Sequence, residues 1–202
     1  MIAFATIGGG LYAALLWQLA RVIAARRSLA LGRFPVIAFV TSMVCAAVSI
    51  TAAPGIPSAL LGAGVIGAVM CGVVDARTGY IFDGLTIAMS SVALSAAAGI
   101  GSLPTALLSG GAVGGSMLAL YALTRGRGIG LGDVKLATAL ALSFGLAWGA
   151  IAVGAAFVIG AAYGIVLLLR HRAKRGDAIR FGPFMAAGAI FALAVDIVGI
   201  HL

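Results

Sequence analysis

The sequence predicts an all-α protein: a polytopic transmembrane helical bundle of about eight spans, with both termini outside. Three observations predict this fold class. First, 63% of the 202 residues are hydrophobic and 9% are charged, whereas soluble domains are about 45–50% apolar and about 25% charged. Second, apolar runs long enough to cross a bilayer follow one another along the chain. Third, the basic residues fall in alternate connections between these runs.

Charge and proline divide the chain into eight apolar runs. A spanning helix needs about 20 mainly apolar residues. All 5 prolines lie at or beside a boundary rather than mid-run, where they would break a helix. The runs are 4–25, 34–53, 59–76, 84–100, 105–124, 133–146, 148–169 and 184–201.

The boundary between the sixth and seventh runs is the least marked. Residues 133–169 contain only Asp133 and Lys135 as charges. A single helix of that length would measure about 55 Å, against a hydrocarbon core of about 30 Å. We therefore predict two spans, with a break near Gly145–Trp148.

The basic residues give the bundle its orientation. All 13 lie in or beside the first, third, fifth and seventh connections. By the positive-inside rule these connections are cytoplasmic. The first run has no basic residues before it, so we expect a retained span rather than a signal peptide. The net charge of +8 then reflects loops that face anionic membrane lipids, and no nucleic-acid partner is expected.

Glycine pairs spaced by four residues recur in two runs. Such pairs allow close approach of helix backbones. We expect packing within the chain, with a homodimer as the alternative. The pairs are Gly110 with Gly114, Gly111 with Gly115, and Gly160 with Gly164.

Two of the 5 acidic residues, all aspartates, stand out by position. Asp75 ends the third run and Asp133 starts the sixth, so both are expected at the cytoplasmic face. Ionisable groups in a membrane chain are functional candidates. Two nearby carboxylates share one proton, which suits general acid–base work on water. The alternatives are an Asp75–Arg77 pair and an Asp133 helix cap.

The remaining polar residues suggest structural roles. Asp83 is expected to cap the fourth span, and Asp177 to be solvated beside Lys174 or Arg180. Asp196 is expected to pair inside the last span. Cys45 and Cys71 are expected to be buried hydrophobes. The sequence shows no metal-binding pattern in its cysteines or in His171 and His201, so neither metal nor cofactor is expected.

Three segments resemble the type IV prepilin peptidases. Residues 74–86 (VDARTGYIFDGLT) resemble the first aspartate segment of that family, and residues 130–136 (GLGDVKL) look like its GxGDxKL segment. Residues 181–184 (FGPF) resemble the Phe-Gly-Pro stretch that opens the last helix. The resemblance covers roughly residues 59–200. We accordingly divide the chain into two N-terminal helices, 1–57, and a six-span peptidase core, 58–202.

The resemblance implies an aspartic endopeptidase of the bacterial inner membrane. It would cleave the leader of a prepilin or pseudopilin helix after a glycine, at the cytoplasmic face. Asp75 and Asp133 would be the catalytic pair. The supporting residues would be Gly130, Gly132, Lys135, Gly182 and Pro183, with Gly130 and Gly132 allowing close approach of an extended substrate. Lys135 would tune the local charge or hold a backbone carbonyl, or else snorkel to lipid headgroups.

Two departures from the family pattern are visible. Phe82 stands where the family has proline, which predicts a less rigid turn after Asp75. The first connection, about 26–33, has no cysteine. The zinc module that larger members carry there is therefore missing, so we expect peptidase activity without methyl transfer. The alternatives are another GxGD intramembrane protease, such as a presenilin-type enzyme, and a small ion-coupled transporter or assembly protein.

Overall fold

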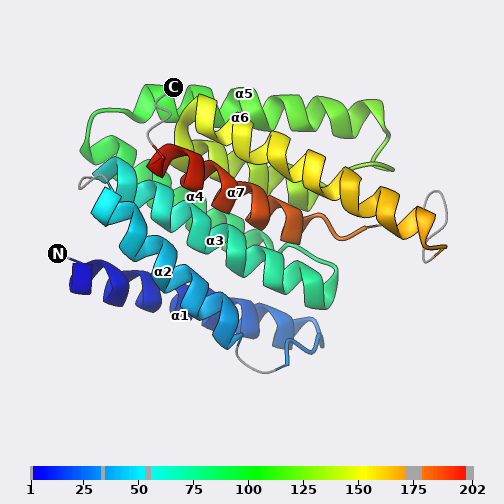
Figure 1. Ribbon diagram of the computed structural model, residues 1–202, viewed down its shortest axis with the longest axis horizontal. Coiled ribbons are helices and arrows are strands. Elements are labelled where there is room, and N and C mark those ends of the chain that lie inside the picture. The colour runs from blue at the N-terminus through cyan, green and yellow to red at the C-terminus, as the bar shows by residue number, and fades with distance from the viewer. Residues whose placement is uncertain (1, 33–34, 53–55, 172–178, 199–202) are drawn as a thin grey trace.

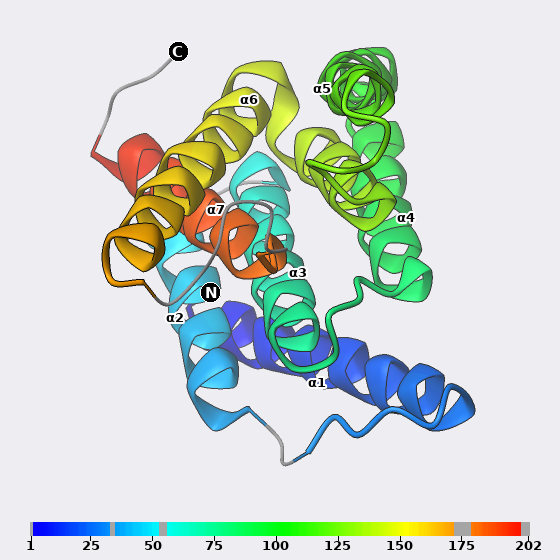
Figure 2. The ribbon, with the colours of Figure 1, turned by 90° about the vertical axis from the view of Figure 1, so that its right-hand side faces the viewer.

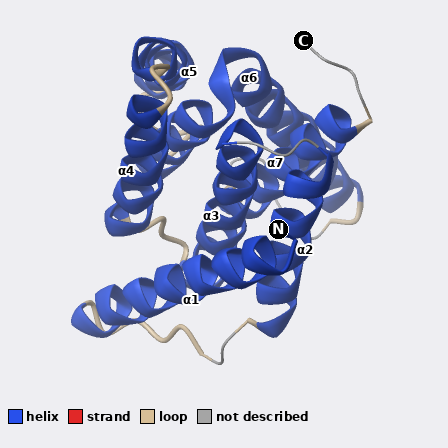
Figure 3. Cartoon of the chain, turned by 90° about the vertical axis from the view of Figure 1, so that its left-hand side faces the viewer, coloured by secondary structure: helices blue, strands red, loops and turns tan. Residues whose placement is uncertain are grey.

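The protein is a bundle of helices (Figure 1), seen here in a computed structural model that describes residues 2–32, 35–52, 56–171 and 179–198. Short loops join the helices, and the described residues form no strand (Figure 3). The predicted all-α helical bundle is therefore confirmed. The helices are α1 (Ile2–Arg26), α2 (Val36–Ala52), α3 (Ile56–Thr78), α4 (Asp83–Gly99), α5 (Leu103–Leu123), α6 (Leu131–Leu169) and α7 (Gly182–Ile197).

Helix α6 consists of two helices joined at a sharp break. Gly145 has φ 79° and ψ 179°, which no helix contains. The break folds the second half back on the first, because a Cβ at Gly149 would lie 2.8 Å from the Cα of Ala141. The predicted division near Gly145–Trp148 is thus observed, and the described residues form eight helical segments, as expected.

Replacing Gly145 should destabilise the bundle through the backbone alone. The conformation of Gly145 is essentially restricted to glycine and costs other residues about 1–3 kcal/mol. A Cβ at Gly145 or at the helical Gly154 would meet nothing within 4 Å. Gly145→Ala should therefore lower the melting temperature in detergent, while Gly154→Ala should leave it unchanged or raise it. Equal melting temperatures for the two variants would contradict this explanation.

The two ends of the bundle differ in their connections. In Figure 1 the start of α1, the end of α7 and the α4–α5 connection lie on the left, and the connections after α1, α3, α5 and α6 lie on the right. The described basic residues lie in or beside these right-hand connections. The folding of the chain thus brings the basic segments to one end, as the alternating pattern predicted.

Within the described part of the chain, four helices are long and apolar enough to cross a membrane. They are the segments Thr6–Arg26, Ala59–Thr78, Leu103–Leu123 and Leu131–Leu169. The segments Val36–Val48 and Gly182–Ile197 are apolar but shorter. The number of spans and the side on which the termini lie stay predictions.

Helix α3 occupies the centre of the bundle (Figure 2) and contacts α1, α2, α4, α6 and α7. Its glycines allow this close packing. A Cβ at Gly64 would lie 2.5 Å from the Phe144 ring, and one at Gly67 would lie 2.5 Å from Met89 Sδ. Close packing against several neighbours therefore fixes the position of α3, which carries Asp75 near its end. The division of the chain at residue 57 stays a prediction.

Most of the paired glycines serve packing within the chain. Gly110 and Gly114 pack against Leu142 and Thr138 of α6, and a Cβ at Gly114 would overlap Thr138. The pair Gly160 and Gly164 packs against Phe181, Phe184 and Ile179. A Cβ at Gly111 or Gly115 would meet nothing within 4 Å. The homodimer stays a prediction.

Candidate active site

Asp75 lies in the last turn of α3 and is only 5% exposed. Its Oδ2 accepts a hydrogen bond from the backbone N–H of Gly182, at 2.9 Å. Its own carbonyl accepts the N–H of Gly79, at 2.8 Å, where the helix ends. Gly79 has φ 73°, a left-handed conformation that glycine adopts readily at a helix C-terminus. The side chain is thus fixed from α7 and the backbone from α3.

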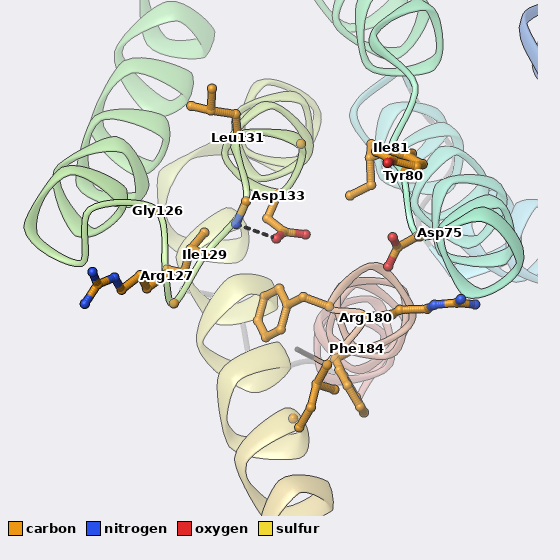
Figure 4. A pocket seen from close by; sticks show the side chains of 17 residues that line it. Asp75, Tyr80, Ile81, Gly126, Arg127, Ile129, Leu131, Asp133, Arg180 and Phe184 are labelled. Carbon is orange, nitrogen blue, oxygen red and sulfur yellow. Dashed lines mark hydrogen bonds between the residues drawn. The ribbon is translucent and has the colours of Figure 1, made fainter. Parts of the chain in front are cut away.

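Asp133 lies in the first turn of α6. Its Oδ2 accepts the N–H of Gly130, the N-cap residue, at 3.1 Å. The capping role considered for Asp133 is therefore observed. It is compatible with a role in the site, because the carboxylate also faces the cleft (Figure 4).

Asp75 and Asp133 line one cleft of about 850 Å³ between α3, α6 and α7. Figure 4 shows the two carboxylates pointing toward each other across it. The cleft lies at the end of the bundle that carries the basic connections. Its other lining residues are Gly79, Tyr80, Ile81, Gly126, Arg127, Gly128, Ile129, Gly130, Leu131, Gly132, Gly160, Ile179, Arg180, Phe181 and Phe184. The sequence predicted that the two aspartates lie at the same face, and the fold places them in one cleft.

Helix α7 begins beside Asp75, and Gly182 makes this possible. A Cβ on Gly182 would lie 2.7 Å from the Cβ of Asp75 and 2.8 Å from its Oδ2. Pro183 follows in the first turn of α7, where its missing N–H costs no helical hydrogen bond. Pro183 lines a different hollow, between α2, α3 and α7, rather than the cleft. Of this pair, only Gly182 contacts an aspartate.

The glycines before Asp133 line the cleft and have close neighbours within the protein. A Cβ on Gly132 would lie 3.0 Å from the Cβ of Ile81. One on Gly130 would lie 3.3 Å from Oδ2 of Asp133. Gly132 thus lets the two aspartate segments approach each other, and Gly130 leaves room for the carboxylate of Asp133. Access for a substrate stays a prediction.

Lys135 and Asp83 connect the two aspartate segments. Lys135 Nζ lies 2.7 Å from Asp83 Oδ1, with both side chains about half exposed (48% and 57%). The expected cap at Asp83 is wrong: the N-cap residue of α4 is Phe82, and Asp83 makes no side-chain cap bond. Lys135 forms an ion pair with Asp83, whereas the roles expected for it were to tune the local charge, to hold a backbone carbonyl or to snorkel to lipid headgroups. Both charged residues stood out in the sequence, but their contact could not be predicted because they lie 52 positions apart.

The Lys135–Asp83 ion pair should affect activity moderately and stability little. Exposed pairs contribute about 0–1 kcal/mol, so Lys135→Gln and Asp83→Asn should leave the melting temperature nearly unchanged. If the pair holds the two segments in register, each variant should lower kcat a few-fold. The double variant should be no worse than either single variant. If the reductions in kcat of the two single variants multiply in the double variant, Lys135 and Asp83 act separately.

Arg180 is a lining residue that the sequence interpretation placed elsewhere. Its guanidinium donates a hydrogen bond to the backbone carbonyl of Ala76, so the segment that leads into α7 also contacts the end of α3. We expected it only as a partner of Asp177, which lies outside the described residues. Arg77, considered as a partner of Asp75, extends over the ring of Trp17. The position of Arg180 directly before the Phe-Gly-Pro stretch is the sequence feature that could have indicated its place in the cleft.

The other polar candidates lie away from the cleft. Asp196 is near the end of α7, toward the opposite end of the bundle. His171 is exposed after α6, and His201 lies outside the described residues. Both cysteines are buried, as expected. Among the described residues, His, Cys, Asp and Glu form no group of three that could hold a metal ion.

Comparison with known families decides the relationship. The model of the type IV leader peptidase family matches residues 62–165. The chain belongs to this family. The matched residues include both aspartates of the cleft and the Asp83–Lys135 pair. The resemblance seen in the sequence is therefore confirmed.

Two curated members of the family are similar in sequence. Both are described as prepilin leader peptidase/N-methyltransferase, from Burkholderia pseudomallei strains 1026b and K96243. Each is 37% identical over 125 residues, which cover 57% of this chain and 39% of the relative. The match thus spans well under half the length of these leader peptidases. No solved structure matches the chain significantly.

Proposed function

We propose that this chain is a membrane aspartic endopeptidase that removes leader peptides from type IV prepilin-like proteins. The observation that carries the proposal is the pair Asp75 and Asp133, which face each other in one cleft of a leader-peptidase family member. The family match favours this reading over presenilin-type proteases. A transporter would need acids near the middle of the membrane, whereas both cleft aspartates lie at helix ends.

The carboxylate pair supplies the chemistry of peptide hydrolysis. Two facing carboxylates share one proton. The ionised one takes a proton from water as the water oxygen bonds to the peptide carbonyl carbon, and the protonated one gives its proton to the carbonyl oxygen. The carboxyl that took the proton from water then gives it to the amide nitrogen as the C–N bond breaks, and the other carboxylate takes a proton from a hydroxyl of the tetrahedral intermediate, so the pair again holds one proton. The products are a carboxyl and an amino terminus, with no net loss of protons.

The expected substrate is a helix with a short leader. We propose cleavage after a glycine, just before the apolar helix, at the cytoplasmic face of the bacterial inner membrane. The basic connections at the cleft end of the bundle support this orientation through the positive-inside rule. The short connection after α1 supports peptide cleavage without methyl transfer.

Coexpression with a prepilin-type substrate tests the proposal. The wild-type chain should shorten the substrate on a gel, and mass spectrometry should place the new N-terminus directly after the glycine. The new amino group should be unmethylated. An intact substrate would contradict the proposed activity. Cleavage at another bond or a methylated amine would contradict the specificity.

Membrane orientation is tested by single cysteines at the two ends of the bundle. Native Cys45 and Cys71 are buried, so they give little background. Ala30→Cys, in the connection after α1, should react with a membrane-impermeant maleimide only after the cytoplasmic side is opened. Ile100→Cys, at the other end and 40% exposed, should react in intact spheroplasts. The reverse pattern would contradict the proposed orientation.

A further inference from the structure

Helix α1 lies outside the residues that the family model matches, yet it contacts the segment that carries Asp75. We propose that Trp17 of α1, through Arg77, positions Asp75 for catalysis. This inference rests on the proposed peptidase function. Trp17 and Arg77 are positioning residues: neither lines the catalytic cleft.

Asp75 and Arg77 leave the last turn of α3 in opposite directions. Residues two apart on a helix are separated by about 200° around its axis. Asp75 therefore points into the cleft while Arg77 points toward α1. Any contact that fixes Arg77 also fixes the turn from which the carboxylate of Asp75 projects.

Arg77 is held by two groups of the N-terminal region. Its guanidinium carbon lies 5.2 Å from the centroid of the Trp17 ring, within the range of a cation–π interaction. Its Nη1 donates to the backbone carbonyl of Leu31, at 2.6 Å. Trp17 and Leu31 are 2% and 6% exposed, so both belong to the packed core.

A second contact from the N-terminal region reaches the segment that joins α3 to α4. Figure 2 shows α1 running beneath the end of α3 and the start of α4. The guanidinium of Arg27 lies 5.9 Å from the Phe82 ring centroid, and Phe82 is 1% exposed. Phe82 therefore anchors the turn by burial, where we expected a less rigid segment in the absence of proline.

The last turn of α3 is thus fixed from two opposite sides. On one side, α7 contributes the Gly182 N–H on Asp75, and the segment just before α7 contributes the Arg180 guanidinium on the Ala76 carbonyl. Helix α1 contributes Trp17 on Arg77. With only one side in place, the turn could pivot and carry the carboxylate away from Asp133. This assigns a role in the proposed reaction to the first helix, which the sequence left without one.

The test uses the full-length chain, purified in detergent, with a prepilin-type substrate. Trp17→Leu keeps an apolar side chain but removes the ring face, and Trp17→Phe keeps a ring. Trp17→Leu and Arg77→Gln should each lower kcat about tenfold with KM nearly unchanged, because a reacting group displaced by about 1 Å can cost up to about 100-fold. Trp17→Phe should recover most of kcat.

Two comparisons separate positioning from general damage. Leu15→Ala, on the same helix and 68% exposed, should leave kcat unchanged. The double variant of Trp17→Leu and Arg77→Gln should be no worse than Arg77→Gln alone, because Arg77→Gln already removes the contact with Trp17. Unchanged kcat in Trp17→Leu, or effects of Trp17→Leu and Arg77→Gln that multiply, would overturn the inference.

Hydrogen exchange gives a readout that needs no substrate. The N–H of Gly79 bonds to the Asp75 carbonyl, so amide exchange over residues 75–79 reports on the last turn of α3. Exchange there should be faster in Trp17→Leu and Arg77→Gln than in wild type and Leu15→Ala. Equal exchange in all four would overturn the inference. A wild-type chain that cleaves nothing would contradict the proposed function, while exchange would still decide whether α1 holds this turn.

Discussion

Asp75→Asn and Asp133→Asn should each abolish leader cleavage. Asparagine keeps the size of the side chain, and its oxygen can still accept the N–H of Gly182 or Gly130, but it cannot take a proton from water. Loss of an acid–base group costs about 10²–10⁴-fold in rate, and we expect at least the upper end because the two carboxylates act as one unit. The measurement is single-turnover cleavage of a prepilin-type substrate by purified protein.

The matched control is Asp196→Asn. Asp196 lies on α7 toward the far end of the bundle, so the same chemical change there should leave cleavage near the wild-type rate. All three variants should purify as monodisperse protein with similar melting temperatures. Cleavage at the wild-type rate by either cleft variant would rule out the proposed pair.

Gly182→Ala should cause the second largest loss, although it adds only one methyl group. The new Cβ would lie 2.7–2.8 Å from side-chain atoms of Asp75, so either the carboxylate or the start of α7 must move. The hydrogen bond from the Gly182 N–H to Asp75 would be broken or bent. We expect kcat to fall about 100-fold, as for a reacting group displaced by about 1 Å.

Gly111→Ala is the control for this substitution. A Cβ at Gly111, on the outer face of α5, would meet nothing within 4 Å, so its activity and melting temperature should match the wild type. For Gly182→Ala the melting temperature should fall far less than kcat. A variant with normal kcat would show that the close approach of α7 does not fix Asp75.

The sequence predicted the helices well because their signals are local. Apolar runs, proline positions and the length argument for residues 133–169 gave eight segments, and the observed break lies at Gly145. These features depend on the composition of neighbouring residues and on the thickness of a bilayer. The same local signals predicted that Asp75 and Asp133 lie at one end of the bundle.

The contacts within the site could not be predicted in this way. The Asp75–Gly182 hydrogen bond spans 107 positions, and the Arg77–Leu31 bond spans 46. Asp83 shows the difficulty most clearly: its place at a helix start indicated a cap, whereas it pairs with Lys135. A charged side chain with several possible partners takes the one that packing brings near.

The sequence by itself determined the class of the protein, its helices, the basic end and the two aspartates that line the cleft. Apolar runs, charges and glycines are features of a few neighbouring residues, so they can be recognised along the chain. Only the tertiary structure decided how Asp75 is held, between Gly182 of α7 on one side and Arg77 with Trp17 of α1 on the other. The physical reason is that side-chain contacts between distant segments form only when helix packing fixes their separation, and no local pattern encodes that distance.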